Sequence, residues 1–106
     1  MKTNKQNKND KEVSITYGDD NSINVNIFNN KILMEIVGSF DNNLKELEKI
    51  SGSKIYFRGN SISIKGEKYA NEKVKDAIEY LIYLFRSDKK IERNDIITAL
   101  NTEMIQ

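Results

Sequence analysis

The sequence contains no cysteine and no histidine among its 106 residues. Without cysteine, the chain forms neither disulfide bonds nor thiolate metal sites, which is consistent with a reducing compartment. Without histidine, it lacks the commonest general base and metal ligand, and with them the usual Ser–His and Cys–His catalytic arrangements. Only carboxylates, lysines and tyrosines remain, and none is paired at a catalytic spacing, so we expect a protein that is not an enzyme.

Long apolar stretches and an excess of one charge are also missing. The longest apolar run, 80–85, is far shorter than the roughly 20 residues that a membrane-spanning helix needs. The first residues lead into no apolar segment typical of a secretory signal. The formal net charge is +1, so a basic surface for nucleic acid can only be local. These absences favour one small cytoplasmic domain that does not contact membranes.

Residues 1–12 are polar and rich in lysine and asparagine. Such a segment buries too little apolar surface to offset its ordering entropy, so we expect a disordered tail here. Its lysines are suited to phosphate contact, but a solvated tail is the simpler interpretation.

Apolar and polar residues alternate on both sides of the turn-forming stretch 18–22. This period of two predicts one strand before the turn and a second strand after it. Asp19 and Asp20 are adjacent carboxylates without a third ligand, and we therefore interpret them as turn residues and not as a metal site. The alternating apolar residues are Val13, Ile15, Tyr17, Ile23, Val25 and Ile27.

Two short helices are predicted on either side of a glycine-led turn. The first begins at the cap Asn29-Asn30 and ends at Gly38, whereas the second begins at the N-cap Asp41 and ends at Gly52. As an N-cap, the Asp41 carboxylate would accept hydrogen bonds from the first helical amides and stabilise the helix by about 1 kcal/mol. The expected buried residues are Ile32, Leu33, Ile36 and Val37 in the first helix, and Leu44, Leu47 and Ile50 in the second.

The stretch 53–66 predicts a β-hairpin with Gly59-Asn60 as its two-residue loop. Glycine at the first loop position suits a type II′ turn, which requires a positive φ there. In this register every apolar residue except Tyr56 lies on one face, and a slip of one residue would lose this sorting. The predicted pairs are Arg58–Ser61, Phe57–Ile62, Tyr56–Ser63 and Ile55–Ile64.

A long amphipathic helix is predicted from Glu67 to about Arg86, and the polar stretch 87–90 ends it. We expect this helix to cover the sheet with Ala70, Val74, Ala77, Ile78, Leu81 and Phe85. Asn94 is predicted to cap a short last helix whose apolar stripe is Ile97, Leu100 and Met104.

The order strand, helix, turn, helix, strand, strand, helix predicts an α+β domain over 13–86, followed by a linker and C-terminal helix over 87–106. At the central turn the chain resembles a type I KH module, whose pattern is Gly-x-x-Gly-x-x-Ile-Lys-x-Ile. The corresponding stretch runs from Gly38 to Leu47 and departs from the pattern at the second glycine, which is Asp41. The resemblance implies a KH-like β-α-α-β-β-α fold with a small antiparallel or mixed three-stranded sheet packed against helices.

A narrower resemblance is to the N-terminal region of PhoH-like proteins, in which a KH-like region precedes a P-loop ATPase domain. The residues that carry it, within roughly 23–104, are Gly38, Asp41, Asn43, Leu44, Leu47, Glu48, Arg58, Gly59, Asn60 and Gly66. This chain has no Gly-x-x-x-x-Gly-Lys-Ser/Thr stretch that would cradle nucleotide phosphates. The resemblance therefore implies that ATP and magnesium bind only to a missing downstream domain, and it is compatible with a homo-oligomeric parent protein.

The KH resemblance also implies a nucleic-acid site, because a KH turn lets a sugar-phosphate backbone approach two helix ends. Asp41 opposes this, since its charge repels a phosphate by about 1 kcal/mol at about 4 Å in water. Phe40 is either an exposed stacking residue or a plug in the core, and we favour the plug. The candidate residues are Gly38, Ser39, Phe40, Asp41, Asn42, Asn43, Lys45 and Lys49 on the turn and second helix, and Lys54, Tyr56 and Arg58 on the next strand.

Two functions are compatible with these residues. The first, which we favour, is weak contact with single-stranded RNA. Lys45 and Lys49 fit it, although beside two glutamates they equally fit a solvated helix face. The second is a protein-interaction or assembly domain that kept the fold and lost its ligand. In that case the last helix, 94–105, docks on a neighbouring subunit or on the missing ATPase domain.

Overall fold

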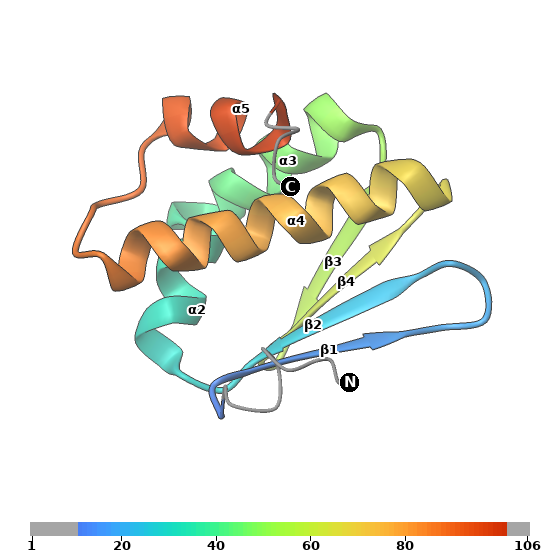
Figure 1. Cartoon of the computed structure of the whole chain (residues 1–106), viewed down its shortest axis with the longest axis horizontal. Helices are drawn as coiled ribbons and strands as arrows, with labels where there is room; N and C mark the ends of the chain where they lie inside the picture. The colour runs from blue at the N-terminus through green and yellow to red at the C-terminus, as the bar shows by residue number, and fades with distance from the viewer. Residues whose placement is uncertain (1–10, 102–106) are drawn as a thin grey trace, which may run out of the picture.

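The computed structural model describes residues 11–101 and shows an antiparallel sheet with helices on one side (Figure 1). The elements are β1 (Val13–Tyr17), β2 (Ile23–Ile27), α2 (Asn30–Val37), the 3-10 turn η1 (Ser39–Asp41), α3 (Asn42–Ser51), β3 (Lys54–Arg58), β4 (Ser61–Lys65), α4 (Lys68–Arg86) and α5 (Arg93–Asn101). From β2 to α4 this is the predicted KH-like β-α-α-β-β-α order. The α+β fold class is therefore confirmed.

The sheet has the strand order β1-β2-β4-β3, and each neighbouring pair is antiparallel. β2, β4 and β3 are the three strands of the KH-like core. The sheet has four strands instead of three because β1 pairs with β2 from Val13↔Ile27 to Tyr17↔Ile23. No described helix covers the opposite side of the sheet (Figure 1).

The turn between β1 and β2 uses its carboxylate as predicted. Asp20 Oδ1 accepts a hydrogen bond from the Ser22 backbone amide at 3.1 Å. Hydrogen bonds from the Ser22 hydroxyl and amide hold the pKa of the Asp20 carboxyl below its ordinary value. Within residues 11–101, no group of three or more potential ligands is arranged to hold a metal ion.

The β3–β4 hairpin has the predicted register. Its cross-strand partners are Arg58↔Ser61, Phe57↔Ile62, Tyr56↔Ser63 and Ile55↔Ile64. A type II′ loop requires a positive φ at its first residue and a negative φ at its second. Gly59 has a φ of 63°, and Asn60 is not among the residues with positive φ, so the loop meets both requirements. The register predicted from local sequence chemistry is therefore confirmed.

The core lies between the sheet and the helices. The inward residues of β2 and β4 are fully buried, and α4 crosses them with its apolar stripe. All four apolar residues predicted for α2 are buried, and α4 buries Asn71, Val74, Ala77, Ile78, Leu81, Ile82 and Leu84. Ala70 and Phe85, which were predicted for the α4 stripe, are only partly buried.

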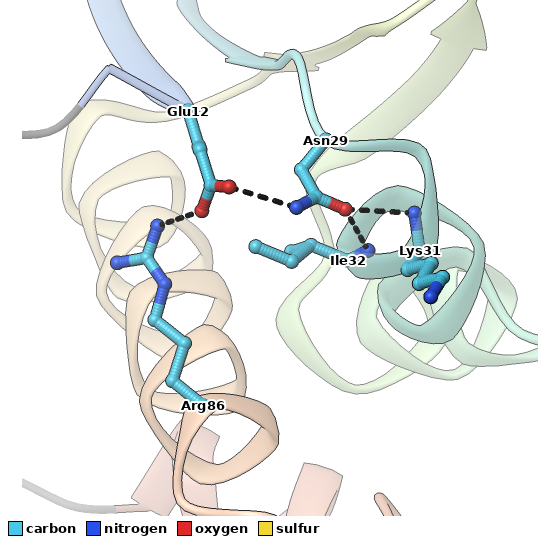
Figure 2. A network of polar contacts seen from close by, with 5 residues as sticks. All are labelled: Glu12, Asn29, Lys31, Ile32 and Arg86. Atoms are coloured by element: carbon cyan, nitrogen blue, oxygen red, sulfur yellow. Dashed lines mark hydrogen bonds and ion pairs between the residues drawn. The ribbon is translucent and has the colours of Figure 1, made fainter.

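Figure 2 shows how the start of α2 is fixed. Asn29 caps the helix as predicted, because its Oδ1 accepts the amides of Lys31 at 2.9 Å and Ile32 at 3.2 Å. Its Nδ2 donates to Glu12 at 2.8 Å, and the other carboxylate oxygen of Glu12 accepts from Arg86 at 2.9 Å. Of the predicted tail 1–12, residues 1–10 lie outside the described residues, whereas Glu12 is bound to the folded domain.

The apolar stripe of α3 is shorter than predicted. Leu44 and Leu47 are buried, but Ile50 is 44% exposed. Each step of three residues falls about 60° short of a full turn, so Ile50 has rotated about 120° from Leu44, away from the core. The prediction that Ile50 is buried is wrong for this reason.

The last helix begins one residue earlier than predicted, so Asn94 lies inside its first turn and is not its cap. Instead, Asp95 Oδ2 accepts the backbone amide of Glu92 at 2.8 Å and the Nζ of Lys89 at 2.8 Å. The hydrogen bond from Lys89 and that from Glu92 lower the pKa of Asp95. The buried residues of α5 are Ile96, Ala99 and Leu100, whereas Ile97 is only partly buried and Met104 lies outside the described residues.

α5 packs on α3 and α4, and its buried side chains join the same hydrophobic core as the sheet. Ile91, in the connection before it, is also part of this core. The apolar face of α5 is therefore already covered by the domain that carries it.

A buried polar residue joins several elements at one end of the sheet. Asn71 Nδ2 donates to the carbonyl of Asn21 at 2.8 Å and to that of Gly66 at 3.0 Å. Its Oδ1 accepts from the hydroxyl of Ser53 at 2.8 Å. Asn71 and Ser53 are only 0% and 1% exposed, so this network is a structural connection and not a surface site.

Candidate nucleic-acid interface

The turn between α2 and α3 exposes its aromatic residue. Phe40 is 89% exposed, and the prediction that it plugs the core is wrong. The residues on either side of the turn, Val37 and Leu44, are the ones that enter the core. Phe40 has a φ of 53° and Asp41 a φ of 61°. Two successive non-glycine residues with positive φ are uncommon and cost free energy, which makes the turn a candidate functional segment.

Asp41 occupies the N-cap position of α3, but its side chain makes no capping hydrogen bond. A capping residue usually has an extended backbone, which directs its side chain back toward the helical amides. Asp41 instead has the left-handed φ and ψ of 61° and 22°. The predicted N-cap position is therefore confirmed, but the predicted hydrogen bonds are wrong, because the Asp41 carboxylate does not accept the first amides of α3.

Asn43 and Gly38 hold the turn together. Asn43 Nδ2 donates to the backbone carbonyl of Glu35 at 3.1 Å and so links α3 to the last turn of α2. Gly38 has a φ of 81°, and a Cβ at this position would lie 2.7 Å from Cγ of Asn43. A side chain at residue 38 would therefore be strained in two ways. Of the candidate residues, these two have a clear structural role.

A cavity of about 440 Å³ lies between α3 and α5, next to the turn. The candidate residues Asn42, Asn43, Lys45 and Lys49 line it together with Glu46, Arg93 and Ile96. Arg93 pairs with Glu46 at 3.1 Å while its side chain remains 71% exposed. Sequence reasoning missed Arg93, because no motif connects it to α3 before α5 is known to pack there.

The remaining candidates, Lys54, Tyr56 and Arg58, lie on a different surface. They alternate along β3 with Ile55 and Phe57, which pack against the core on the helical side. Their side chains therefore point to the side of the sheet that no described helix covers. The candidate residues thus form two surfaces instead of one groove.

The outer edge of β3 is partly occupied. Glu48 Oε2 on α3 accepts the backbone amide of Ile55 at 2.9 Å. Because an edge strand leaves alternate amides unpaired, this carboxylate takes a donor that a ligand could otherwise use.

A cluster of one lysine and three carboxylates lies on α4. Lys75 Nζ lies 2.8 Å from Asp76, 3.5 Å from Glu72 and 3.8 Å from Glu79. Burial opposes the charged form of Lys75, but the hydrogen bond to Asp76 and the charge of Glu79 outweigh it and raise its pKa. Burial also raises the pKa of Glu79. One lysine faces three carboxylates here, so the cluster has an excess of negative charge and offers no positive charge to a phosphate.

No family model and no curated protein matches the chain. A similar solved structure is the crystal structure of the a/eIF2alpha-aDim2p-rRNA complex from Pyrococcus horikoshii OT3. A chain of that complex matches 86% of this chain with a TM-score of 0.57 and 18% sequence identity, and this chain spans 46% of that chain. The two chains share a fold. At this identity the similarity establishes the fold alone.

In the part of the chain that is described, no helix has both the length and the apolar character needed to cross a membrane.

Proposed function

We propose that this chain is a KH-like module that contacts single-stranded RNA weakly through the α2–α3 turn and the adjoining face of α3. The observation that carries the proposal is Phe40, which is 89% exposed on a backbone with positive φ. Lys45 and Lys49 supply positive charge in the cavity beside α3, where Arg93 is paired with Glu46. A fold similar to that of a chain from an rRNA complex supports the choice of RNA.

The expected affinity is low because the turn combines opposing contributions. Stacking of a base on an aromatic side chain contributes about 1 to 3 kcal/mol. The charge of Asp41, whose side chain makes no capping hydrogen bond, opposes a phosphate by about 1 kcal/mol at about 4 Å in water and by more in a shielded position. The positive side chains near Asp41 offset part of this repulsion, and their contribution falls as salt concentration rises.

Titration of the full chain with a short labelled oligouridylate at low salt tests this function. Phe40→Ala should weaken binding about fivefold or more through the lost stacking, and Asp41→Asn should strengthen it about fivefold through the lost repulsion. Tyr69→Ala is the control, because Tyr69 is an exposed aromatic residue, at 70%, on α4 and outside the turn. If Phe40→Ala binds like Tyr69→Ala and Asp41→Asn binds like the wild type, the turn is not an RNA site.

We further propose that the chain is the N-terminal module of a cytoplasmic PhoH-like protein and is not itself an enzyme. Its support is the matching residues from Gly38 to Gly66, together with the absence of histidine and cysteine from the whole sequence. ATP and magnesium would bind to a downstream P-loop domain. The reading frame that encodes this chain should then continue into a Gly-x-x-x-x-Gly-Lys-Ser/Thr sequence, and a continuation without one would reject this assignment.

The alternative, an assembly domain without nucleic-acid binding, stays a second proposal with less support from α5. The apolar residues Ile96, Ala99 and Leu100 of α5 are buried against α3 and α4. They are therefore not free to dock on an ATPase domain or on a neighbouring subunit.

A further inference from the structure

The side of the sheet opposite the helices has an unusual composition. The outward-facing residues of β1 and β2 are all small and polar, and those of β4 and β3 add positive charge. These residues are Ser14, Thr16, Asn24, Asn26, Ser61, Ser63, Lys65, Lys54, Tyr56 and Arg58. We call this set the open sheet face. It contains no carboxylate and no aliphatic side chain, although the chain has nearly as many acidic residues (16) as basic ones (17).

Within residues 11–101, the positive charges on the open sheet face form no ion pairs. Lys54 and Lys65 are direct cross-strand partners, an arrangement of like charges that destabilises a sheet. Among the described residues, neither these lysines nor Arg58 forms a salt bridge. The charge of Lys65 also lowers the pKa of Asp20 in the β1–β2 turn, but the hydrogen bonds from Ser22 lower it more. A bound anion would relieve the Lys54–Lys65 repulsion.

Tyr56 lies between these charges. Its side chain is 54% exposed, and Nζ of Lys65 is 5.9 Å from the centroid of its ring. Along β3, Lys54, Tyr56 and Arg58 follow one another at intervals of two residues, which corresponds to about 7 Å. An extended polyanion running along β3 would therefore meet a cation, an aromatic ring and a second cation in turn.

We propose that the open sheet face is a second contact surface for single-stranded nucleic acid. It is separate from the α2–α3 turn and does not depend on RNA binding there. Phosphates would pair with the cations, and a base would stack on Tyr56, which is how single strands are held without sequence preference. A second copy of the chain fits less well, because a face-to-face dimer would bring like charges together. An acidic peptide would match the charges but would not use the ring.

The experiment measures binding of a labelled oligouridylate of about twelve nucleotides to the full chain over a range of salt concentrations. Lys54→Gln/Lys65→Gln should lower affinity at low salt and reduce the slope of log K against log salt by about 1.4, at about 0.7 per phosphate contact. The control Lys31→Gln/Lys68→Gln removes two exposed lysines elsewhere and should leave the slope nearly unchanged. An identical slope in the two double variants overturns the proposal.

The tyrosine is tested separately. Tyr56→Ser should weaken oligonucleotide binding about fivefold or more, whereas Tyr69→Ser, at a tyrosine of α4 that is 70% exposed, should have little effect. If Tyr56→Ser has no effect and polyglutamate competes as well as the oligonucleotide, the face binds acidic chains in general and the proposal fails.

Two results separate this surface from the turn. Lys45→Gln/Lys49→Gln should leave part of the binding intact, together with the chemical-shift changes of residues 54–65 on oligonucleotide addition. If it abolishes both, a second surface does not exist. Conversely, Phe40→Ala can leave oligonucleotide affinity unchanged while Tyr56→Ser weakens it. That result rejects the function proposed for the turn and supports the open sheet face as the binding surface.

Discussion

Asn71 and the α2–α3 turn show two different uses of polar residues at junctions between elements. At Asn71, both ends of the amide are hydrogen-bonded and the side chain is fully buried. In the turn, Asp41 makes no capping hydrogen bond and Phe40 is almost fully exposed. A polar group with all its partners inside the molecule contributes to stability. A turn that keeps uncommon backbone angles and leaves its side chains in solvent is where we look for a ligand.

The largest effect on stability is expected for Asn71→Ala. The change leaves the hydroxyl of Ser53 and the carbonyls of Asn21 and Gly66 without their buried partner, and we expect a loss of about 3 kcal/mol in the free energy of unfolding. Urea denaturation measures it. Asn30→Ala, at an exposed asparagine in the first turn of α2, should change stability by less than about 0.5 kcal/mol. Equal effects of the two variants would show that the comparison above is wrong.

A smaller effect is expected for Gly38→Ala, which tests whether the turn depends on close packing. Gly52→Ala is its control, because Gly52 also has a positive φ, 86°, but nothing lies within 4 Å of an added Cβ. Gly52→Ala should cost about 1 kcal/mol from backbone strain alone. Gly38→Ala should cost at least about 1 kcal/mol more, because Asn43 must move. The same cost at both positions would mean that Asn43 adapts without strain.

The smallest changes in stability are expected at the two helix N-caps. Asn29 makes capping hydrogen bonds, whereas Asp41 only occupies the N-cap position. Asn29→Ala should cost about 1 kcal/mol, because the amides of Lys31 and Ile32 lose their acceptor. Asp41→Gly should cost nothing and should raise stability by up to about 0.5 kcal/mol, since glycine adopts a positive φ without strain. Thermal unfolding of both variants measures the difference. A loss of 1 kcal/mol for Asp41→Gly would restore Asp41 as a cap.

The parts of the fold that sequence reasoning predicted depend on local chemistry. The β3–β4 register follows from Gly59 and from alternation along two adjacent strands, and the α2 helix follows from Asn29, its spacing and Gly38. In each case the interacting residues are close in sequence, so the pattern contains the information.

The errors arose where packing between distant elements decides the outcome. Asn71 lies one residue after Ala70, which was predicted for the apolar stripe, and nothing in the sequence indicates that Asn21 and Ser53 meet it. Arg93 joins the cavity beside the turn only because α5 packs on α3. Phe40 was assigned to the core on the general tendency of aromatic residues, whereas its position between two helix ends exposes it.

The hydrogen bond from the Ile55 amide to Glu48 has a consequence for self-association. β3 is a border strand of the sheet, and borders of this kind recruit strands from other molecules and lead to aggregates. Many proteins discourage such recruitment with lysines or bulges in the border strand itself. β3 itself has Lys54 and Arg58, and the Glu48 carboxylate of the neighbouring helix α3 adds to their effect by accepting the amide of Ile55.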